Sequence, residues 1–182
     1  MRGFKLHHYP NSQTEPLPPS DASELMVTFP LRFETSDRAG GQTSNMEPVH
    51  ILLVEDCAGD ALLMQQVLAS CPVAYKLHIA RDGEQALQML ADPNLKPDLI
   101  ILDLNLPRIT GLGVLERYYP RDIPVVVFSA SSMQTDKEFA LALGASEYIP
   151  KPVDLPAFTD AVCGIVNKWA GRKRSGALIL RR

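Results

Sequence analysis

The sequence has few of the features that mark membrane, secreted or nucleic-acid-binding proteins. Its 182 residues contain three cysteines, Cys57, Cys71 and Cys163, with no CxxC spacing, which predicts neither a disulfide framework nor a zinc site. No run approaches the ~20 apolar residues of a membrane span, and the first residues lead into polar, proline-rich sequence rather than a secretory signal. A net charge of −3 argues against a dedicated nucleic-acid binder. We therefore expect a cytoplasmic protein without membrane insertion or direct nucleic-acid contact.

Composition divides the chain into three parts. Residues 1–45 contain five prolines and no sustained periodicity, which predicts a disordered extension. Because Met46 precedes the first strong strand pattern, a mis-start of translation explains these residues equally well. Residues 46–170, with 9 basic and 16 acidic residues, form the expected folded domain. Residues 171–182 carry five basic residues and no acidic one, which is typical of a solvated tail, with a docking arm for an acidic partner as the alternative.

Apolar runs of strand length alternate with helical patterns through the folded part. Strands are expected at 49–54, 76–80, 98–102, 124–128 and 147–149, and helices at 60–69, 83–90, 112–118, 135–143 and 155–169. The first, third and fourth runs are continuous and rich in Ile, Leu and Val, as in strands covered on both faces, and the second alternates like an edge strand. Five β-α units in sequence predict an α/β fold, a doubly wound parallel sheet with helices on both faces.

Local signals mark the helix ends and buried faces. Asp82 suits an N-cap and Gly144 a C-terminal cap. In the last helix, five apolar residues step by three and four positions, which predicts a stripe that packs on the core. These residues are Leu155, Phe158, Val162, Ile165 and Trp169.

Carboxylates follow two of the predicted strands. Glu55 and Asp56 come directly after the first strand, and Asp103 follows the third. In a doubly wound sheet the site lies beyond the carboxyl ends of the strands, so these three acids should share one crevice. Their repulsion is unfavourable unless a cation lies among them, and Mg²⁺ suits a site with few protein ligands. Taken singly, each acid is equally explained as a loop carboxylate stabilised by a helix N-terminus.

A hydroxyl and a lysine follow the last two strands. Ser129 ends the fourth run and offers a donor to a phosphoryl oxygen, while Lys151 after the fifth run offers a positive charge. Three acids, one hydroxyl and one lysine together suit Mg²⁺ and phosphoryl binding, with one carboxylate as nucleophile. The set lacks a histidine or another evident general base, which disfavours hydrolysis of a stable ester. A covalent aspartyl phosphate is the chemistry that remains.

Four segments carry a resemblance to a known family. ILLVEDCAGDA, DLIILDLNLPRITGLGVL, IPVVVFSAS and YIPKPVD occur in the order found in bacterial response-regulator receiver domains, the CheY-like group, and cover about residues 48–170. The VED and DLNLP forms resemble the single-domain regulators found beside phytochrome-type histidine kinases. The resemblance implies a five-stranded flavodoxin-like sheet of order 2-1-3-4-5. Thr110-Gly111 departs from the family's usual Asp-Gly, which leaves the catalytic positions intact.

The resemblance also assigns roles to individual residues. It implies that Asp103 is the phosphoacceptor, that Ser129 and Lys151 contact the phosphoryl group, and that Ser129 and Tyr148 form the conformational switch. The implied Mg²⁺ ligands are Glu55 (mostly through water), Asp56, Asp103 and the backbone carbonyl of Asn105.

The expected function is that of a phosphorelay signalling protein. The partner would be a sensor histidine kinase, phytochrome-like by the resemblance, or a phosphotransfer protein, and the output would be contact with a target or with a second copy in a homodimer. The chain would not be an enzyme with a separate substrate, although it would assist its own phosphorylation and dephosphorylation. One alternative is an interaction module that does not use phosphorylation. Another, a Mg²⁺-dependent phosphatase of the haloacid-dehalogenase type, lacks its second Asp, because Asn105 occupies that position.

Overall fold

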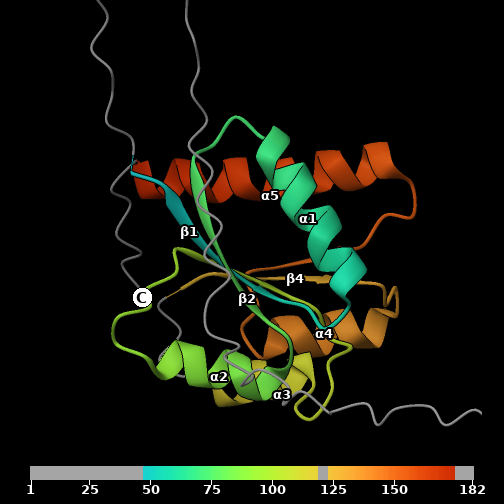
Figure 1. Ribbon diagram of the computed structural model, residues 1–182. Coiled ribbons are helices and arrows are strands. Elements are labelled where there is room, and N and C mark those ends of the chain that lie inside the picture. The colour runs from blue at the N-terminus through green and yellow to red at the C-terminus, as the bar shows by residue number, and fades with distance from the viewer. Residues whose placement is uncertain (1–46, 119–122, 175–182) are drawn as a thin grey trace, which may run out of the picture.

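Five strands and five helices alternate along the part of the chain that the computed structural model describes, residues 47–118 and 123–174 (Figure 1). The strands are β1 (Val49–Val54), β2 (Tyr75–Ala80), β3 (Leu99–Leu102), β4 (Val125–Ser129) and β5 (Glu147–Pro150). The helices are α1 (Ala58–Ser70), α2 (Gly83–Ala91), α3 (Gly111–Arg117), α4 (Gln134–Ala142) and α5 (Leu155–Arg174). The expectations for residues 1–45 and 175–182 lie outside the described residues. α5 continues past position 170, where composition placed the end of the folded domain.

The strands form one parallel sheet of order β2-β1-β3-β4-β5, which confirms the predicted α/β fold class and strand order. β2 is an edge strand, as its alternating pattern indicated. β1, β3 and β4 are buried along almost their whole length because helices cover both faces of the sheet.

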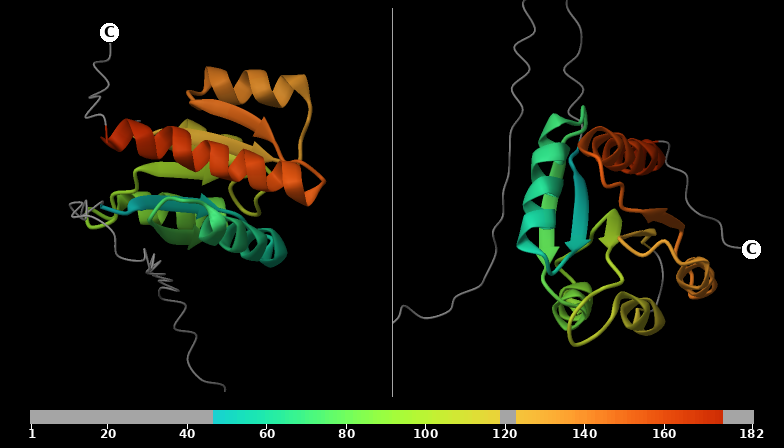
Figure 2. Two further views of the ribbon diagram at one scale, coloured as in Figure 1. Left: turned by 90° about the horizontal axis from the view of Figure 1, so that it is seen from above. Right: turned by 90° about the vertical axis from the view of Figure 1, so that its right-hand side faces the viewer.

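The two faces of the sheet carry separate apolar layers. α1 and α5 lie on one face, and α2, α3 and α4 lie on the other (Figures 1 and 2). Successive strand residues alternate between the layers, so Ile51 packs under α1 and α5 while Leu52 packs toward α2 and α3. Phe128 meets Phe158 of α5 edge to face, 5.3 Å between ring centroids.

The structure confirms both helix caps and most of the buried stripe that the sequence predicts. The Asp82 side chain accepts a hydrogen bond from the Gln85 N–H at 2.8 Å, and Gly144 takes the left-handed conformation after α4. Four residues of the α5 stripe are buried, but Leu155 was wrongly assigned to it. Leu155 is 56% exposed because it begins the helix before α5 reaches the sheet. None of the described helices is long and apolar enough to cross a bilayer.

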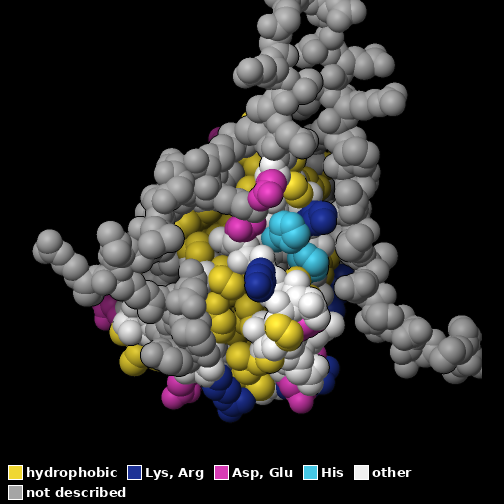
Figure 3. All heavy atoms as spheres, turned by 90° about the vertical axis from the view of Figure 1, so that its left-hand side faces the viewer, with side chains coloured by type: hydrophobic (Ala, Val, Ile, Leu, Met, Phe, Trp, Pro, Cys, Tyr) yellow, Lys and Arg dark blue, Asp and Glu magenta, His cyan; other side chains and the backbone are white. Residues whose placement is uncertain are grey.

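Two histidines stack across the edge of the sheet. His50 of β1 and His78 of β2 lie with their rings 6.0 Å apart, centroid to centroid, and form the cyan patch in Figure 3. Diagonal pairs on neighbouring strands commonly make such contacts.

The prediction that the cysteines form no disulfide was wrong. Cys71, at the C-cap of α1, is bonded to Cys163 of α5, across a sequence separation of 92 residues. Local spacing carries no signal of this pair, because only the packing of α1 beside α5 brings the two residues together. Cys57 is exposed and free.

The disulfide predicts a difference between the oxidised and reduced protein. Closing so long a loop restricts the unfolded chain, so reduction should lower the free energy of unfolding by roughly 2–5 kcal/mol. Urea unfolding with and without dithiothreitol measures this change in the free energy of unfolding. The Cys163→Ser variant cannot form the disulfide, so dithiothreitol should not change its stability. Reaction of the unfolded, unreduced chain with a thiol reagent should detect one thiol, and detection of three would contradict the bond.

Candidate functional site

Strand register brings the predicted site residues to one edge of the sheet. Val54 pairs with Leu102, so Glu55 and Asp103 leave β1 and β3 at the same level, and the Asp103 N–H donates to the Val54 carbonyl at 3.0 Å. At the other strands, Ser129 is the last residue of β4, and the Lys151 N–H donates to its carbonyl at 2.8 Å. The backbone ladder therefore fixes where all four side chains begin.

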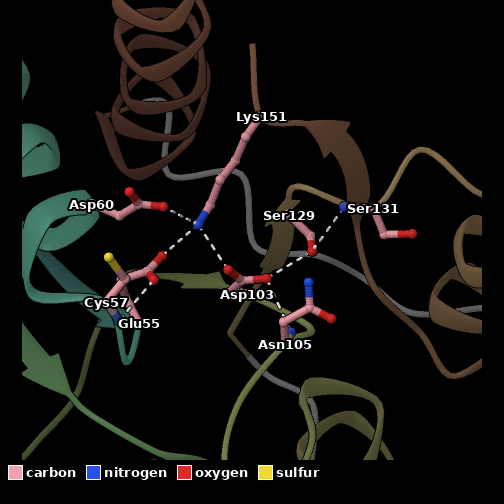
Figure 4. Close-up of polar contacts among 8 residues, drawn as sticks. All are labelled: Glu55, Cys57, Asp60, Asp103, Asn105, Ser129, Ser131 and Lys151. Atoms are coloured by element: carbon pink, nitrogen blue, oxygen red, sulfur yellow. Dashed lines mark hydrogen bonds and ion pairs between the residues drawn. The ribbon is translucent and has the colours of Figure 1, made fainter. Parts of the chain in front are cut away.

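The Lys151 ammonium group lies among three carboxylates (Figure 4). Its Nζ donates to Glu55 Oε2 at 2.7 Å, to Asp103 Oδ2 at 2.7 Å and to Asp60 Oδ2 at 2.8 Å. The Lys151 side chain is only 10% exposed, so its ammonium group is largely shielded from water. Glu55, Asp103 and Lys151 were predicted together, whereas Asp60 was not, since an acid in the first turn of a helix is common and gives no functional signal.

The second carboxylate oxygen of Asp103 has other partners than Lys151. Asp103 Oδ1 accepts hydrogen bonds from the Ser129 hydroxyl at 2.7 Å and from the Asn105 N–H at 3.1 Å. The Ser131 N–H donates in turn to Ser129 Oγ at 3.4 Å, and the buried Tyr148 hydroxyl donates to the Ser131 carbonyl at 2.8 Å. A chain of hydrogen bonds therefore runs from Asp103 through the β4–α4 loop to Tyr148 in β5.

Burial and Lys151 have opposite effects on the pKa values of Glu55 and Asp103. Burial is the largest effect on Glu55 and raises its pKa above the ordinary value, although Lys151 offsets part of the shift. Burial would also raise the pKa of Asp103, but hydrogen bonds from Lys151, Ser129 and Asn105 hold it below its usual range. Burial acts to lower the pKa of Lys151, and its three carboxylate partners raise it instead. The Asp103 carboxylate therefore ionises more readily than an ordinary aspartate, although it is nearly buried.

The oxygen ligands at this edge fit a hard divalent cation. The carboxylates of Glu55, Asp56, Asp60 and Asp103 outnumber the one positive charge of Lys151. Asp56 is exposed, and it makes no hydrogen bond or ion pair to a described residue, so its oxygens are accessible. Among the described residues, no three His, Cys, Asp or Glu side chains are gathered into a metal-binding group. Mg²⁺ suits such an open set because it commonly takes one or two carboxylates and keeps several waters.

Comparison with known proteins agrees with this geometry. Residues 51–163 match the family model described as the response regulator receiver domain. The chain belongs to this family. Over 131 residues the receiver domain is 35% identical to the response regulator Rcp1 of Synechocystis, a match that covers 67% of this chain and 89% of Rcp1. It is also 34% identical to the nitrate/nitrite response regulator NarL of Escherichia coli, but that match spans only 51% of NarL and 61% of this chain.

Solved structures of response regulators are similar to this receiver domain. The phosphorylated cyanobacterial phytochrome response regulator RcpA is 36% identical with a TM-score of 0.64, and the match covers 68% of this chain and 94% of RcpA. The Mn²⁺-bound form of Rcp1 is 36% identical with a TM-score of 0.62, over 68% of this chain and 95% of Rcp1. A CheY-like receiver domain from Methanospirillum hungatei has a TM-score of 0.59 at 23% identity, and the match covers 71% of this chain and 99% of that domain. This likeness supports the fold.

The loop after β3 shows how this receiver domain accommodates its Thr110-Gly111 sequence. The Thr110 hydroxyl accepts a hydrogen bond from the Gly113 N–H at 3.2 Å and so caps α3, as an Asp would. Arg108 adopts a left-handed backbone conformation, φ 64°, and its guanidinium pairs with Asp82 and Glu84 of the β2–α2 region. These contacts anchor the segment that follows Asp103.

Gly111 is required by close packing against that segment. A Cβ at position 111 would collide with the Asp103 carbonyl oxygen and lie 2.7 Å from Leu104 Cα. Because both are backbone atoms, which cannot move aside like the end of a flexible side chain, Gly111→Ala should lower the free energy of unfolding by about 1–3 kcal/mol or more. Urea unfolding checks this, with Gly164→Ala as the matched control. Position 164 has open space, so there the same change should add roughly 0.5–1 kcal/mol, and equal effects at both positions would contradict the packing.

Proposed function

We propose that the protein is a single-domain response regulator of a two-component phosphorelay. In this proposal Asp103 accepts a phosphoryl group from the phosphohistidine of a sensor histidine kinase or of a phosphotransfer protein. The observation that carries the proposal is the buried Asp103 carboxylate held between Lys151 on one side and Ser129 on the other, with hydrogen bonds that lower its pKa. Such a carboxylate is prepared for attack on phosphorus while donors for the phosphoryl oxygens stand beside it.

The proposed transfer uses these groups as follows. An Asp103 oxygen attacks phosphorus as the bond from phosphorus to the imidazole nitrogen breaks, and the electron pair of that bond stays on the imidazole. Ser129 and Lys151 then donate to phosphoryl oxygens instead of to the free carboxylate. Bound Mg²⁺, held by Asp56, Asp103, the Asn105 carbonyl and through water by Glu55, would reduce repulsion between the carboxylate and the incoming group. The same groups would assist dephosphorylation, without a separate substrate.

The hydrogen-bond chain through the β4–α4 loop supports a switch role for Ser129 and Tyr148. If the Ser129 hydroxyl donates to a phosphoryl oxygen instead of to Asp103, the Ser131 N–H that donates to Ser129 Oγ would shift with it, and the Tyr148 hydroxyl donates to the carbonyl of the same Ser131. The loop leads into α4, on which Met133 at the N-cap and Phe139 are each more than 60% exposed. We infer that the surface of α4, β5 and α5 binds a target or a second copy of the chain, its output being a protein contact.

The likeness to Rcp1 and RcpA supports a phytochrome-like kinase as the proposed partner, since RcpA is described as a phytochrome response regulator. We place this exchange in the cytoplasm, where ATP sustains kinase phosphorylation.

Loss of the acceptor carboxylate should abolish phosphorylation. Asp103→Asn retains the size of the side chain but removes the nucleophilic charge, so incubation with phosphoramidate and Mg²⁺ should add no phosphoryl group. Intact-protein mass spectrometry measures the product. Asp160→Asn, which neutralises an exposed carboxylate of α5, serves as the matched control and should be labelled like the wild type. Wild-type labelling of Asp103→Asn would refute the assignment, and an unlabelled wild type would favour the phosphorylation-independent interaction module.

Removal of divalent metal should stop the same reaction. With EDTA in excess, labelling should fall to background and recover when Mg²⁺ is added, because the carboxylates then regain a counter-charge. Asp56→Asn should raise the Mg²⁺ concentration for half-maximal labelling by about tenfold or more, since it removes a proposed ligand. A Mg²⁺ requirement unchanged by Asp56→Asn would contradict the ligand assignment.

A further inference from the structure

One carboxylate of the site has no part in the proposed transfer. Asp60 lies in the first turn of α1, and its side chain is 43% exposed, whereas those of Glu55 and Asp103 are 4% and 6% exposed. It reaches Lys151 from the side of α1, with Asp103 on the other side of the ammonium group (Figure 4).

The three contacts of Lys151 use every donor that it has. A lysine ammonium group carries three N–H bonds, and Glu55, Asp60 and Asp103 each accept one. The side chain is a flexible four-carbon stem, so acceptors on several sides are needed to hold the ammonium group in one place. Glu55 from β1 and Asp60 from α1 supply two of these anchors, and neither needs to move when Asp103 changes.

We propose that Asp60 is a positioning residue for phosphoryl transfer that acts through Lys151. With Glu55 it fixes two N–H bonds and directs the third at the Asp103 oxygen, where a phosphoryl oxygen takes over as acceptor after transfer. Asp60 itself forms and breaks no covalent bond. The inference rests on the proposed phosphorylation of Asp103 and adds to it a residue that sets the direction of the lysine.

A simpler role for Asp60 predicts a different outcome. An acid in the first turn of a helix is stabilised by the helix dipole, and this effect does not depend on Lys151. Positioning through Lys151 does depend on it, so a double-mutant cycle separates the two roles.

The test compares initial rates of labelling by phosphoramidate at saturating Mg²⁺, followed by intact-protein mass spectrometry. Asp60→Ala should slow labelling by roughly three- to tenfold, and Asp60→Asn, whose amide oxygen still accepts from Lys151, should recover part of the rate. Asp160→Ala, which removes an exposed carboxylate from α5, should leave the rate unchanged. In a Lys151→Ala background, Asp60→Ala should cause no further slowing. Urea midpoints measured on each variant show whether it is folded.

Two results would overturn the inference. The first is that Asp60→Ala is labelled as fast as Asp160→Ala. The second is that Asp60→Ala slows labelling by the same factor in the wild-type protein and in the Lys151→Ala background. If Lys151→Ala takes up no phosphoryl group, the double-mutant cycle cannot be read, and the labelling rates of Asp60→Asn and Asp60→Ala are compared instead. Equal slowing by both variants would contradict a positioning role for Asp60. A wild-type protein that is not labelled would refute the proposed function and this inference with it. A wild-type protein that is labelled normally, together with an Asp60→Ala variant labelled at the same rate, would refute the inference alone.

Discussion

The site depends on one buried positive charge. Without the Lys151 ammonium group, Glu55 and Asp103 would be two nearly buried carboxylates at one sheet edge, and their repulsion and desolvation would favour protonation. Lys151 offsets that cost and links β1, α1, β3 and β5 at their functional ends. These contacts hold the pKa of Asp103 below its usual range, whereas at Glu55 burial outweighs Lys151 and the pKa rises, so two neighbouring acids differ in how readily they ionise.

Much of this arrangement could be predicted from the sequence because it follows from the periodicity of parallel strands. Buried apolar runs located the strand ends to within one residue, and the strand ends brought Glu55, Asp103, Ser129 and Lys151 together at one edge of the sheet. Asp56 is exposed at the end of β1, and its place as a metal ligand stays a prediction.

Features that depend on packing between helices could not be predicted in the same way. Asp60 reaches Lys151 only because α1 begins at the carboxyl end of β1, and the bond between Cys71 and Cys163 exists only because α1 and α5 lie on the same face. Leu155 fitted the spacing of the α5 stripe, but spacing does not reveal where a helix first meets the sheet.

In the proposed function, these contacts prepare one carboxylate, that of Asp103, for phosphoryl transfer. The most direct measurement treats the phosphorylated protein with borohydride, which reduces an acyl phosphate to an alcohol and so converts a phosphorylated aspartate to homoserine. Peptide mass spectrometry then identifies the modified position. We predict homoserine at position 103 and at no other acid of the site. Homoserine at position 56 or 60, or none after verified phosphorylation, would contradict it.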